Sequence, residues 1–455
     1  MVINVIIKNL EELLSHGNVK GREIVIDIIE HSLREANSYN LTKKLVRYKN
    51  GILKIKSLSY DLSKVNHIYV IGAGKNSTFI AAALEEILGN RINEGVIIEK
   101  KGWGCKTEKI PIIEGGHPLP DENGLKGTEE IIRIAERTKK GDLVFVCITG
   151  GCTALTLLPP KDLSLEDVRA VSDLLLKSGA PIEDINTVRK HLSRIGGGKL
   201  SILLHPAEII SLIVVDEVAG LPWGPTVPDA TTFSDAIKVL KKYDLWDKVP
   251  DSVRKYFEKA DPNEETPNVS DFKRVGVKVH NLILANNEVI CKAAEERARK
   301  LGINAAILST TMEGEAKEVG IVLASIAKEI EKGNRPFKAP CVLIAGGETT
   351  VTIQGEAGEG GRNQELALAA ATKISGSKNI VITSIGTDGT DGPTDIAGAI
   401  VDGYTADRAK NIGIDIFEHL KKHNSSYVFK QLEDAIYTNP TGTNLMDLMV
   451  IYIGK

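Results

Sequence analysis

The sequence predicts an α/β fold of two domains whose sheets are mostly parallel. Short apolar runs alternate with helical patterns along most of the 455 residues. Several runs are continuously apolar and rich in Val and Ile, which is typical of strands buried on both faces. Such strand–helix alternation indicates an α/β class.

Each element follows from its own pattern. Apolar runs predict strands at 67–74, 95–100, 142–151, 208–218, 304–310, 341–353, 379–389 and 447–454. Helical periodicity between them predicts helices at 76–88, 128–140, 164–178, 286–301 and 363–374. Ser164 and Asp167 predict a capping box that opens one of these helices.

A polar segment marks the predicted domain boundary. Residues 261–276, DPNEETPNVSDFKRVG, contain two prolines and few apolar side chains. We therefore assign residues 1–270 to an N-terminal domain and residues 271–455 to a second, smaller α/β domain.

Composition excludes several classes of protein. A net charge of −3 provides no positive electrostatic field to bind nucleic acid. The most apolar stretch, residues 209–215, is too short to span a membrane. Five cysteines without CxxC spacing argue against a disulfide scaffold or a zinc site. This cysteine usage fits a reducing cytoplasm, and the N-terminus lacks the apolar core of a signal peptide, so we expect a cytoplasmic location.

Gly-rich loops follow four predicted strands, GAG (72–74), TGG (149–151), AGGET (345–349) and GTDGTDGPTD (386–395). In open parallel sheets, ligands bind at the carboxyl ends of the strands. Two such loops in each predicted domain indicate a cleft between the domains.

The segment VIGAGKNST (70–78) runs from a strand into a helix. Backbone amides at such a turn attract phosphate, so Gly72 and Gly74 are predicted to bind nucleotide and Lys75 adds a mobile positive charge. The segment also half-matches GxGxxG, and Glu99 lies where a dinucleotide fold keeps its ribose-binding acid. A nicotinamide site and a tight turn with a solvated lysine are the alternatives.

A second strand–loop–helix junction, residues 142–155, offers amides and hydroxyls to a phosphoryl group from Thr149, Gly150, Gly151 and Thr153. No GxxxxGK[ST] pattern occurs in the chain, so it is not a P-loop protein. Cys152 beside this loop is expected to be a buried small hydrophobe, because no base can be assigned to it.

The helical segment 185–195 places Asn186, Arg189 and Lys190 on one face, opposite an apolar stripe. Such a face suits an anionic substrate, and a solvated face is the alternative. His117 and Asp229 lie in Pro-rich turns, and for them a turn or a structural histidine is the simpler interpretation.

In the C-terminal half, Arg362 lies between a Gly-rich loop and a helix, where it can reach a phosphate bidentately. Glu348 follows a strand and, if buried, needs a metal, a substrate hydroxyl or a cation as partner. Asp388, Asp391 and Asp395 crowd one strand end. We predict that Asp388 and Asp391 hold Mg²⁺ that arrives with ATP, with an Asx turn as the alternative.

Taken together, these stretches resemble the glycerate 2-kinase family, which joins an N-terminal Rossmann-like domain to a C-terminal MOFRL domain. The matching motifs occur in the family's order and cover nearly the whole chain: VIGAGK, GGHPLPD, NTVRKHLSRIGGGKL, GPTVPD, GGETTV, GEGGRNQEL, GTDGTDGPTD and NPTGTNLMDL. The chain departs from the family at Cys152, where a Gly is usual, and at 214–229, which is shortened.

The resemblance implies transfer of the γ-phosphoryl group of ATP to the 2-hydroxyl of D-glycerate, which gives 2-phosphoglycerate. Lys75 and Arg362 match the residues central to this transfer, and Asp388 is predicted to hold Mg²⁺ or to orient the attacking hydroxyl. Asn186, Arg189, Lys190 and Glu348 are predicted to bind the hydroxy-acid substrate. The sequence does not determine the oligomeric state, and a homodimer is one candidate assembly.

Three other functions stay open at this point. The first is a kinase for another small hydroxy acid or sugar acid, because the departures lie near the acceptor. The second is an NAD(P)H-dependent hydroxypyruvate reductase that uses the GAG turn and Glu99. The third is a sugar-phosphate-binding regulator without catalysis, which leaves Arg362 and the aspartate cluster unexplained.

Overall fold

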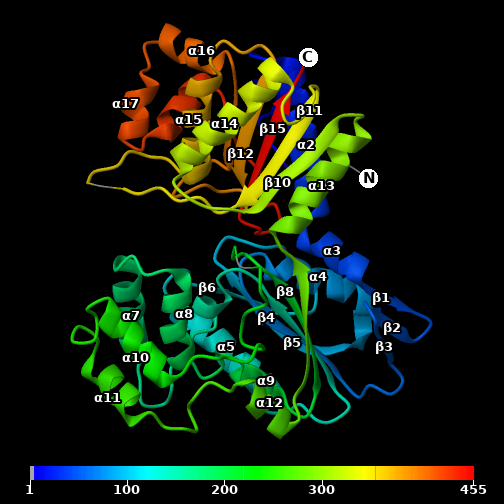
Figure 1. Cartoon of the computed structure of the whole chain (residues 1–455). Coiled ribbons are helices and arrows are strands. Elements are labelled where there is room, and N and C mark those ends of the chain that lie inside the picture. The colour runs from blue at the N-terminus through cyan, green and yellow to red at the C-terminus, as the bar shows by residue number, and fades with distance from the viewer. Residues whose placement is uncertain (1–4, 219, 354) are drawn as a thin grey trace. The chain divides into compact units, whose positions relative to one another are not determined.

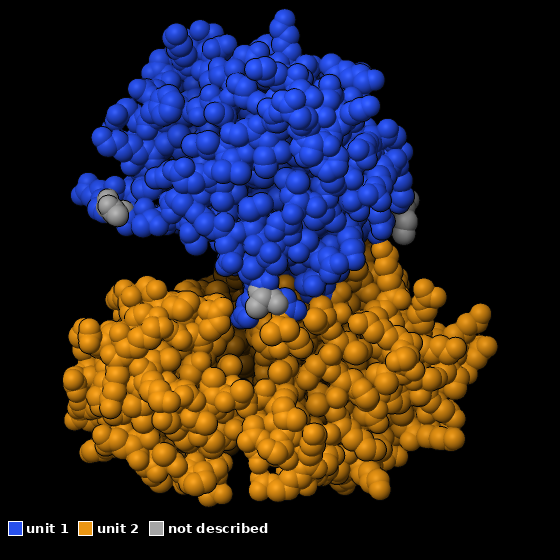
Figure 2. Space-filling view, in the orientation of Figure 1, with its two compact units in different colours: residues 1–37, 216–220, 285–455 blue, residues 38–215, 221–284 orange. Residues whose placement is uncertain are grey.

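The computed structural model describes residues 5–218, 220–353 and 355–455 in two compact units (Figure 2). Unit 1 comprises Met1–Asn37, Asp216–Gly220 and Ala285–Lys455, and unit 2 comprises Ser38–Val215 and Leu221–Leu284. The predicted boundary after residue 270 lies within a helix of unit 2, Val269–Val275. The chain therefore crosses between the units more often than the sequence pattern indicates.

Unit 2 is built on a six-stranded sheet with the order β6-β5-β4-β7-β8-β9. The pairs β6–β5, β5–β4, β4–β7 and β7–β8 are parallel, as the strand–helix alternation predicts. The strands are β4 (Ile68–Ala73), β5 (Ile92–Lys100), β6 (Ile112–Gly115), β7 (Leu143–Ile148), β8 (Glu208–Val214) and β9 (Lys278–Ala285). The carboxyl ends of the five parallel strands, β4 to β8, consequently lie at the same side of this sheet.

Helices of unit 2 form two packing groups. One group shares a core with the sheet: α5 (Glu122–Ala135) and α9 (Lys199–Leu204). The other has a core of its own: α7 (Leu165–Lys177), α8 (Ile182–His191), α10 (Phe233–Lys242) and α11 (Asp251–Lys259). The remaining elements are α3 (Ser38–Leu45), α4 (Ser77–Leu88), η1 (Gly89–Arg91), α6 (Cys152–Leu155), α12 (Val269–Val275) and the small antiparallel sheet β1 (Val46–Lys49), β2 (Ile52–Ile55) and β3 (Leu58–Asp61).

Unit 1 contains a second six-stranded sheet with the order β10-β11-β15-β12-β13-β14. Only β10–β11 is parallel, and the other four pairs are antiparallel. The strands are β10 (Asn304–Met312), β11 (Cys341–Gly347), β12 (Ile380–Gly386), β13 (Gly398–Asp402), β14 (Ala435–Ile436) and β15 (Asp447–Ile453). The expectation of parallel sheets is therefore correct for unit 2 and wrong for most of unit 1.

Helices cover both faces of the unit 1 sheet (Figure 1). The helices α2 (Val19–Glu35) and α13 (Asn287–Lys300) pack together on one face, and α14 (Ala316–Gly333) and α15 (Arg362–Ile374) pack together on the other. Short helices complete the unit: α1 (Leu10–Leu13), α16 (Thr405–Asn411), α17 (Ile416–Lys421) and α18 (Ser425–Leu432). Among the residues described, no helix combines the length and apolar character needed to cross a bilayer.

A buried ionic network fixes the N-terminal helix α2 to unit 1. The Arg22 guanidinium is fully buried, and its Nε and Nη1 atoms donate to Asp402 and Asp434, each at 2.7 Å. Removing one partner of such a network leaves an uncompensated charge in the interior, which lowers the free energy of unfolding by about 3 kcal/mol or more. This anchoring explains why the first residues belong with a sheet formed some 300 residues later.

Element boundaries follow local capping chemistry. The predicted capping box is confirmed, since Ser164 Oγ accepts from the Asp167 N–H at 3.1 Å and Asp167 Oδ2 accepts from the Ser164 N–H at 2.9 Å. The helix predicted at 128–140 instead begins at Glu122, because Asp121 caps it by accepting from the Gly124 N–H at 2.8 Å. An N-cap carboxylate can thus start a helix before its apolar periodicity becomes visible.

Candidate functional site

Two Gly-rich loops of unit 2, at the carboxyl ends of β4 and β7, are joined by backbone hydrogen bonds. The Lys75 N–H donates to the Gly150 carbonyl at 2.8 Å, and the Thr149 N–H donates to the Ala73 carbonyl at 3.2 Å. Gly74 has φ of 128°, and a Cβ there would lie 2.2 Å from Thr149 Oγ1. The glycine is therefore needed for the close approach of one loop to the other.

Two backbone amides at the GAG turn and the start of α4 already have partners inside the protein. The Gly74 N–H donates to the Ile98 carbonyl at 3.1 Å, and the Asn76 N–H donates to Glu99 Oε1 at 2.9 Å. The Gly74 amide that was predicted to bind phosphate is thus used by the neighbouring strand β5. Positive charge for a ligand comes instead from side chains around the loop.

Glu99 lies at the N-terminus of α4 with no exposed surface. Its Oε2 accepts from the N–H and the hydroxyl of Thr78 at 3.3 and 3.1 Å. Burial raises the pKa of Glu99 to about 7, although these hydrogen bonds lower it. The carboxylate caps a helix, so the ribose-binding role that the nicotinamide alternative gives to Glu99 does not fit this geometry.

Three cations gather around the loops of unit 2. The ammonium groups of Lys100 and Lys75 lie 4.3 and 5.3 Å from the ring centroid of Trp103. Both lysines and Arg189 act electrostatically on the imidazole of His117. They come from three different elements, the end of β5, the start of α4 and helix α8, so the tertiary fold assembles the cluster.

Arg189 is the most unusual of the three. Its side chain is 4% exposed, its Nη2 donates to the Pro118 carbonyl at 3.4 Å, and its buried Nε has no hydrogen-bond partner among the described residues. Across the same described residues it forms no ion pair. Burial alone lowers the pKa of Arg189 to about 10. A buried guanidinium without a carboxylate is costly, so this position is suited to an anionic ligand.

The other predicted residues of unit 2 divide between this cluster and other surroundings. Thr149 Oγ1 is buried without a partner among the described residues, whereas Thr153 is half-buried in α6. Asn186 is half-buried one turn before Arg189 on α8. Lys190 has an acidic partner of its own, since its ammonium pairs with Asp229 at 3.4 Å. Of the two cations predicted to bind the substrate from α8, Arg189 is therefore the one without an ion pair among the described residues.

Sequence reasoning missed Lys100 as a member of the cluster and took His117 for a structural histidine. A Cβ at Gly151 would lie 2.7 Å from His117 Cδ2, which places the imidazole directly against the second Gly-rich loop. Both residues follow or end a strand of the parallel sheet, and this position was the available signal. Cys152 in the same loop is 1% exposed, so the prediction of a buried small hydrophobe is confirmed.

In unit 1, Arg362 is held between two carboxylates. Its Nε and Nη2 donate to Asp447 at 2.7 and 3.0 Å, and its Nη1 lies 2.7 Å from Glu348 Oε1. Burial opposes the positive charge, but Asp447 and Glu348 raise the pKa of Arg362 above its ordinary value. The partner expected for Glu348 is therefore a cation.

Asp447 is a member of this site that sequence reasoning missed. It begins β15, which runs antiparallel to β11 and β12, so Asp447 lies opposite Gly347 and Gly386 at the strand edge. It has no exposed surface, and burial raises its pKa although Arg362 and Asn363 lower it. A search of strand ends in a parallel sheet could not find the first residue of an antiparallel strand.

Asp391, which was predicted to hold Mg²⁺ together with Asp388, forms hydrogen bonds to a helix N-terminus. Asp391 Oδ1 accepts from the N–H and side-chain amide of Asn363 at 3.1 and 3.2 Å, and Oδ2 accepts from the corresponding groups of Gln364 at 2.9 and 3.0 Å. Four N–H donors occupy the acceptor sites of one carboxylate. Asp391 thus caps α15, and burial raises its pKa to about 6. This geometry leaves little room for Asp391 as a metal ligand.

Asp388 forms the Asx turn that was the alternative interpretation, with Oδ1 accepting from the Thr390 N–H at 3.1 Å. It is half-buried, whereas Asp395 is exposed. Within the part of the chain that the structure describes, no three His, Cys, Asp or Glu side chains converge as a metal site. Of the two aspartates predicted to hold metal, Asp388 has the more accessible carboxylate.

Comparison with known proteins identifies the family. The DUF4147 model, described as a domain of unknown function, matches residues 24–258, and the MOFRL family model matches residues 341–447. A glycerate 2-kinase of Pyrococcus horikoshii is 41% identical over 435 residues, which are 95% of this chain and 97% of that protein. The chain belongs to the glycerate 2-kinase family.

A solved structure supports the same family, whereas one other relative carries a different functional name. The crystal structure of a glycerate kinase from Thermotoga maritima has 35% sequence identity and a TM-score of 0.82, and the match covers 95% of this chain and 99% of that one. A protein of Agrobacterium vitis named a putative hydroxypyruvate reductase is 36% identical over 85% of this chain and 87% of its own. The family and the α/β fold implied by the resemblance are thus confirmed.

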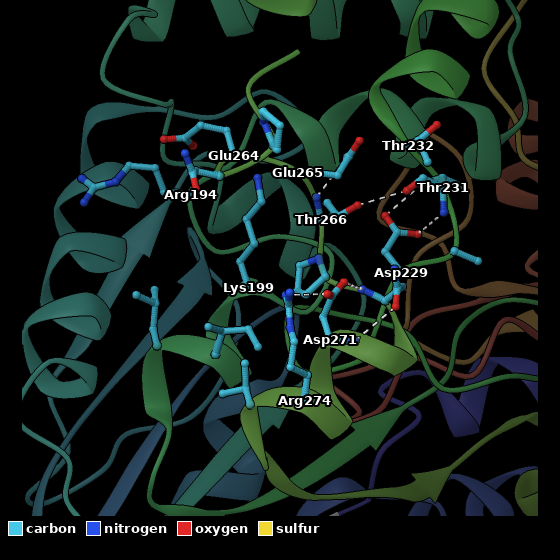
Figure 3. Close-up of a pocket in the computed structure, with 18 of the residues that line it drawn as sticks. Arg194, Lys199, Asp229, Thr231, Thr232, Glu264, Glu265, Thr266, Asp271 and Arg274 are labelled. Carbon is cyan, nitrogen blue, oxygen red and sulfur yellow. Dashed lines mark hydrogen bonds and ion pairs between the residues drawn. The ribbon is translucent and has the colours of Figure 1, made fainter.

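A separate cavity of about 670 Å³ lies in unit 2 of this glycerate 2-kinase family member (Figure 3). None of the predicted site residues is among the described residues that line it. Two of its acids already have partners, since Glu265 lies 2.8 Å from His191 Nε2 and Asp229 lies 3.4 Å from the Lys190 ammonium. Arg189, by contrast, forms no ion pair among the described residues.

Proposed function

We propose that the chain transfers the γ-phosphoryl group of ATP, with Mg²⁺, to the 2-hydroxyl of D-glycerate. The observation that carries this proposal is the buried guanidinium of Arg189, which has no acidic partner among the described residues. It lies with Lys75 and Lys100 in one electrostatic cluster. Membership of the glycerate 2-kinase family supplies the reaction class, and relatives in Pyrococcus horikoshii and Thermotoga maritima carry that name.

Phosphoryl transfer needs charge neutralisation and positioning more than covalent chemistry by the protein. Arg189 binds the carboxylate of the acceptor, because a guanidinium matches a carboxylate in shape and charge. Asn186, one turn away, adds an amide to this acceptor site. Lys75 neutralises oxygens of the transferred group, where negative charge is held in the transition state.

Arg362 contributes a fixed guanidinium from unit 1. Asp447 and Glu348 use three of its N–H groups, so its orientation is set before any ligand arrives. Its remaining N–H groups donate to phosphate oxygens. Asp391 acts indirectly by capping α15, the helix that begins with Arg362.

Asp388 is the residue that would hold Mg²⁺, which supplies charge neutralisation on the nucleotide phosphates when bound. A hard carboxylate oxygen at a half-buried loop fits that ion. Because three acidic ligands do not converge among the described residues, we infer that the ion arrives with the nucleotide.

A coupled assay tests the proposal. The chain is supplied with ATP, Mg²⁺ and D-glycerate together with enolase and no phosphoglycerate mutase. Enolase uses the 2-phosphate, so absorbance from phosphoenolpyruvate appears only if the 2-hydroxyl is phosphorylated. ADP release without phosphoenolpyruvate would mean transfer to another hydroxyl. The absence of both ADP and phosphoenolpyruvate would refute the kinase proposal for this acceptor.

The names of the Agrobacterium vitis relatives favour hydroxypyruvate reduction as a second candidate. This function predicts NADH oxidation with hydroxypyruvate and no requirement for Mg²⁺. We expect no such oxidation, because Glu99 is buried at the start of α4 instead of facing a ribose. A panel of other hydroxy acids in the kinase assay tests the remaining alternative.

A further inference from the structure

His117 lies in the loop after β6, where its ring contacts the loop after β7. A Cβ placed on Gly151 would lie 2.7 Å from Cδ2 and 2.8 Å from Nε2 of His117. The Nε2 edge of the imidazole therefore faces the loop that also carries Thr149, whose hydroxyl has no partner among the described residues. The sequence favoured a structural histidine here, and a structural histidine normally has a hydrogen-bond partner.

Throughout residues 5–218, 220–353 and 355–455, neither ring nitrogen of His117 forms a hydrogen bond or an ion pair. The charged groups that act on the ring are Lys75, Lys100 and Arg189, and no acidic group is among them. Burial first, and then these three cations, lower the pKa of His117 to about 4. At neutral pH the imidazole is uncharged, so one ring nitrogen donates and the other accepts.

We propose that His117 binds substrate, accepting a hydrogen bond from the 2-hydroxyl of the acceptor beside the cations that hold its carboxylate. This inference rests on the proposed function for the identity of the acceptor. Lysine and arginine side chains only donate, so the cations of the cluster recognise the anionic end of a hydroxy acid and not its hydroxyl hydrogen. A neutral imidazole supplies the missing acceptor.

The proposal gives His117 a role in specificity that can be measured by binding. D-glycerate carries the 2-hydroxyl, whereas 3-hydroxypropionate has the same carboxylate and terminal hydroxyl without it. A site that hydrogen-bonds a hydroxyl discriminates against the analogue that lacks it. One neutral hydrogen bond corresponds to about a tenfold difference in Kd.

Isothermal titration of both ligands into the whole protein tests this role. We expect the wild-type chain to bind D-glycerate about tenfold more tightly than 3-hydroxypropionate. In His117→Ala this preference should disappear because D-glycerate weakens, while the Kd of 3-hydroxypropionate changes less than about twofold. His117→Gln, whose amide oxygen can accept near the position of Nε2, should recover part of the preference.

Other outcomes would overturn the proposal. Equal weakening of both ligands in His117→Ala would show a structural role, and unchanged preference would show that His117 does not touch the hydroxyl. Thermal unfolding of each variant, with His280→Ala as a matched histidine control on β9, establishes that the variants are folded. If His117→Ala does not fold, His117→Gln and His117→Asn carry the test. Glycerate binding without phosphoryl transfer would contradict the proposed function and leave the test of His117 intact.

Discussion

Two helix N-termini, one in each unit, are both capped by a buried carboxylate, but the cations beside them differ in their acidic partners. Helix α4 of unit 2 begins under the buried carboxylate of Glu99, and helix α15 of unit 1 begins under the buried carboxylate of Asp391. A basic residue, Lys75 or Arg362, stands next to each cap. In both, an internal acid takes the amide groups that a bound phosphate would otherwise use.

The difference lies in what balances the cations. Arg362 is neutralised inside the protein by Asp447 and Glu348. The cations around His117 include Arg189, which has no acidic partner among the described residues. A balanced cation is oriented in advance, whereas an unbalanced buried cation is stabilised only when a ligand brings negative charge. We therefore expect variants of the two clusters to affect stability with opposite sign.

Arg362→Ala should have the largest effect. It removes a transition-state donor and leaves Asp447, which has no exposed surface, without its cation. We predict a loss of about 100-fold or more in kcat and about 3 kcal/mol in the free energy of unfolding. Enolase-coupled kinetics and urea unfolding measure the two effects.

The matched control for Arg362 is Arg297→Ala. Arg297 makes a similar bidentate pair with Asp27, at 2.8 Å for both contacts, but at a partly exposed position of unit 1. We expect a loss of about 1 kcal/mol or less and unchanged kcat. If Arg362→Ala is as mild as this control, the balanced cluster is only a surface ion pair.

Lys75→Ala should affect catalysis more than stability. The variant loses one of the three cations around His117, so we predict a decrease of about 100-fold in kcat with a smaller change in KM. The neighbouring exposed Lys101 serves as the control, and Lys101→Ala should retain full turnover. Near-full turnover of Lys75→Ala would place the catalytic charge elsewhere.

The sequence was sufficient for what depends on local order. Continuous apolar strands, Gly-rich strand ends and the Ser164–Asp167 box are all readable along the chain, so the parallel sheet of unit 2 and the positions of Lys75 and Arg189 were predictable. The same reasoning failed for the sheet of unit 1. Its strands are as apolar as parallel ones because helices bury both faces, so composition could not reveal their direction.

The details of the candidate site depend on pairs that are distant in sequence. Glu99 accepts a hydrogen bond from Asn76, and Asp391 accepts one from Gln364, so both acids cap a helix and are not free to bind a ligand. Asp447, which the sequence did not single out, accepts from Arg362 and orients it. A sequence identifies an acid near a Gly-rich loop. Only the fold shows whether its oxygens are directed to a helix N-terminus or to a ligand.

Arg189→Met separates the two clusters most directly. We predict that the Kd of D-glycerate rises about tenfold to a hundredfold, because a charged hydrogen bond to the carboxylate is lost. The unliganded protein should become about 1 kcal/mol more stable, since the buried unbalanced charge is removed. Calorimetric titration and urea unfolding, with Arg194→Met as the control, measure both changes. A loss of stability in Arg189→Met would contradict the view that this cation awaits a ligand.

The last expected effect concerns the two capping carboxylates and the dependence of stability on pH, and it leaves the cations of both clusters in place. Burial raises the pKa of Glu99 from an ordinary 4.5 to about 7, so the folded state holds this proton more tightly than the unfolded chain. The resulting stabilisation, at most about 3 kcal/mol, is complete below about pH 4.5 and is lost as the pH rises through 7. Glu99→Gln should flatten this part of the stability profile, and Asp391→Asn should flatten the part near pH 6. Urea unfolding from pH 5 to 8 measures the slopes, with Glu94→Gln at the surface as the control. An unchanged slope in Glu99→Gln would mean that this cap is ionised in the folded protein across the whole range.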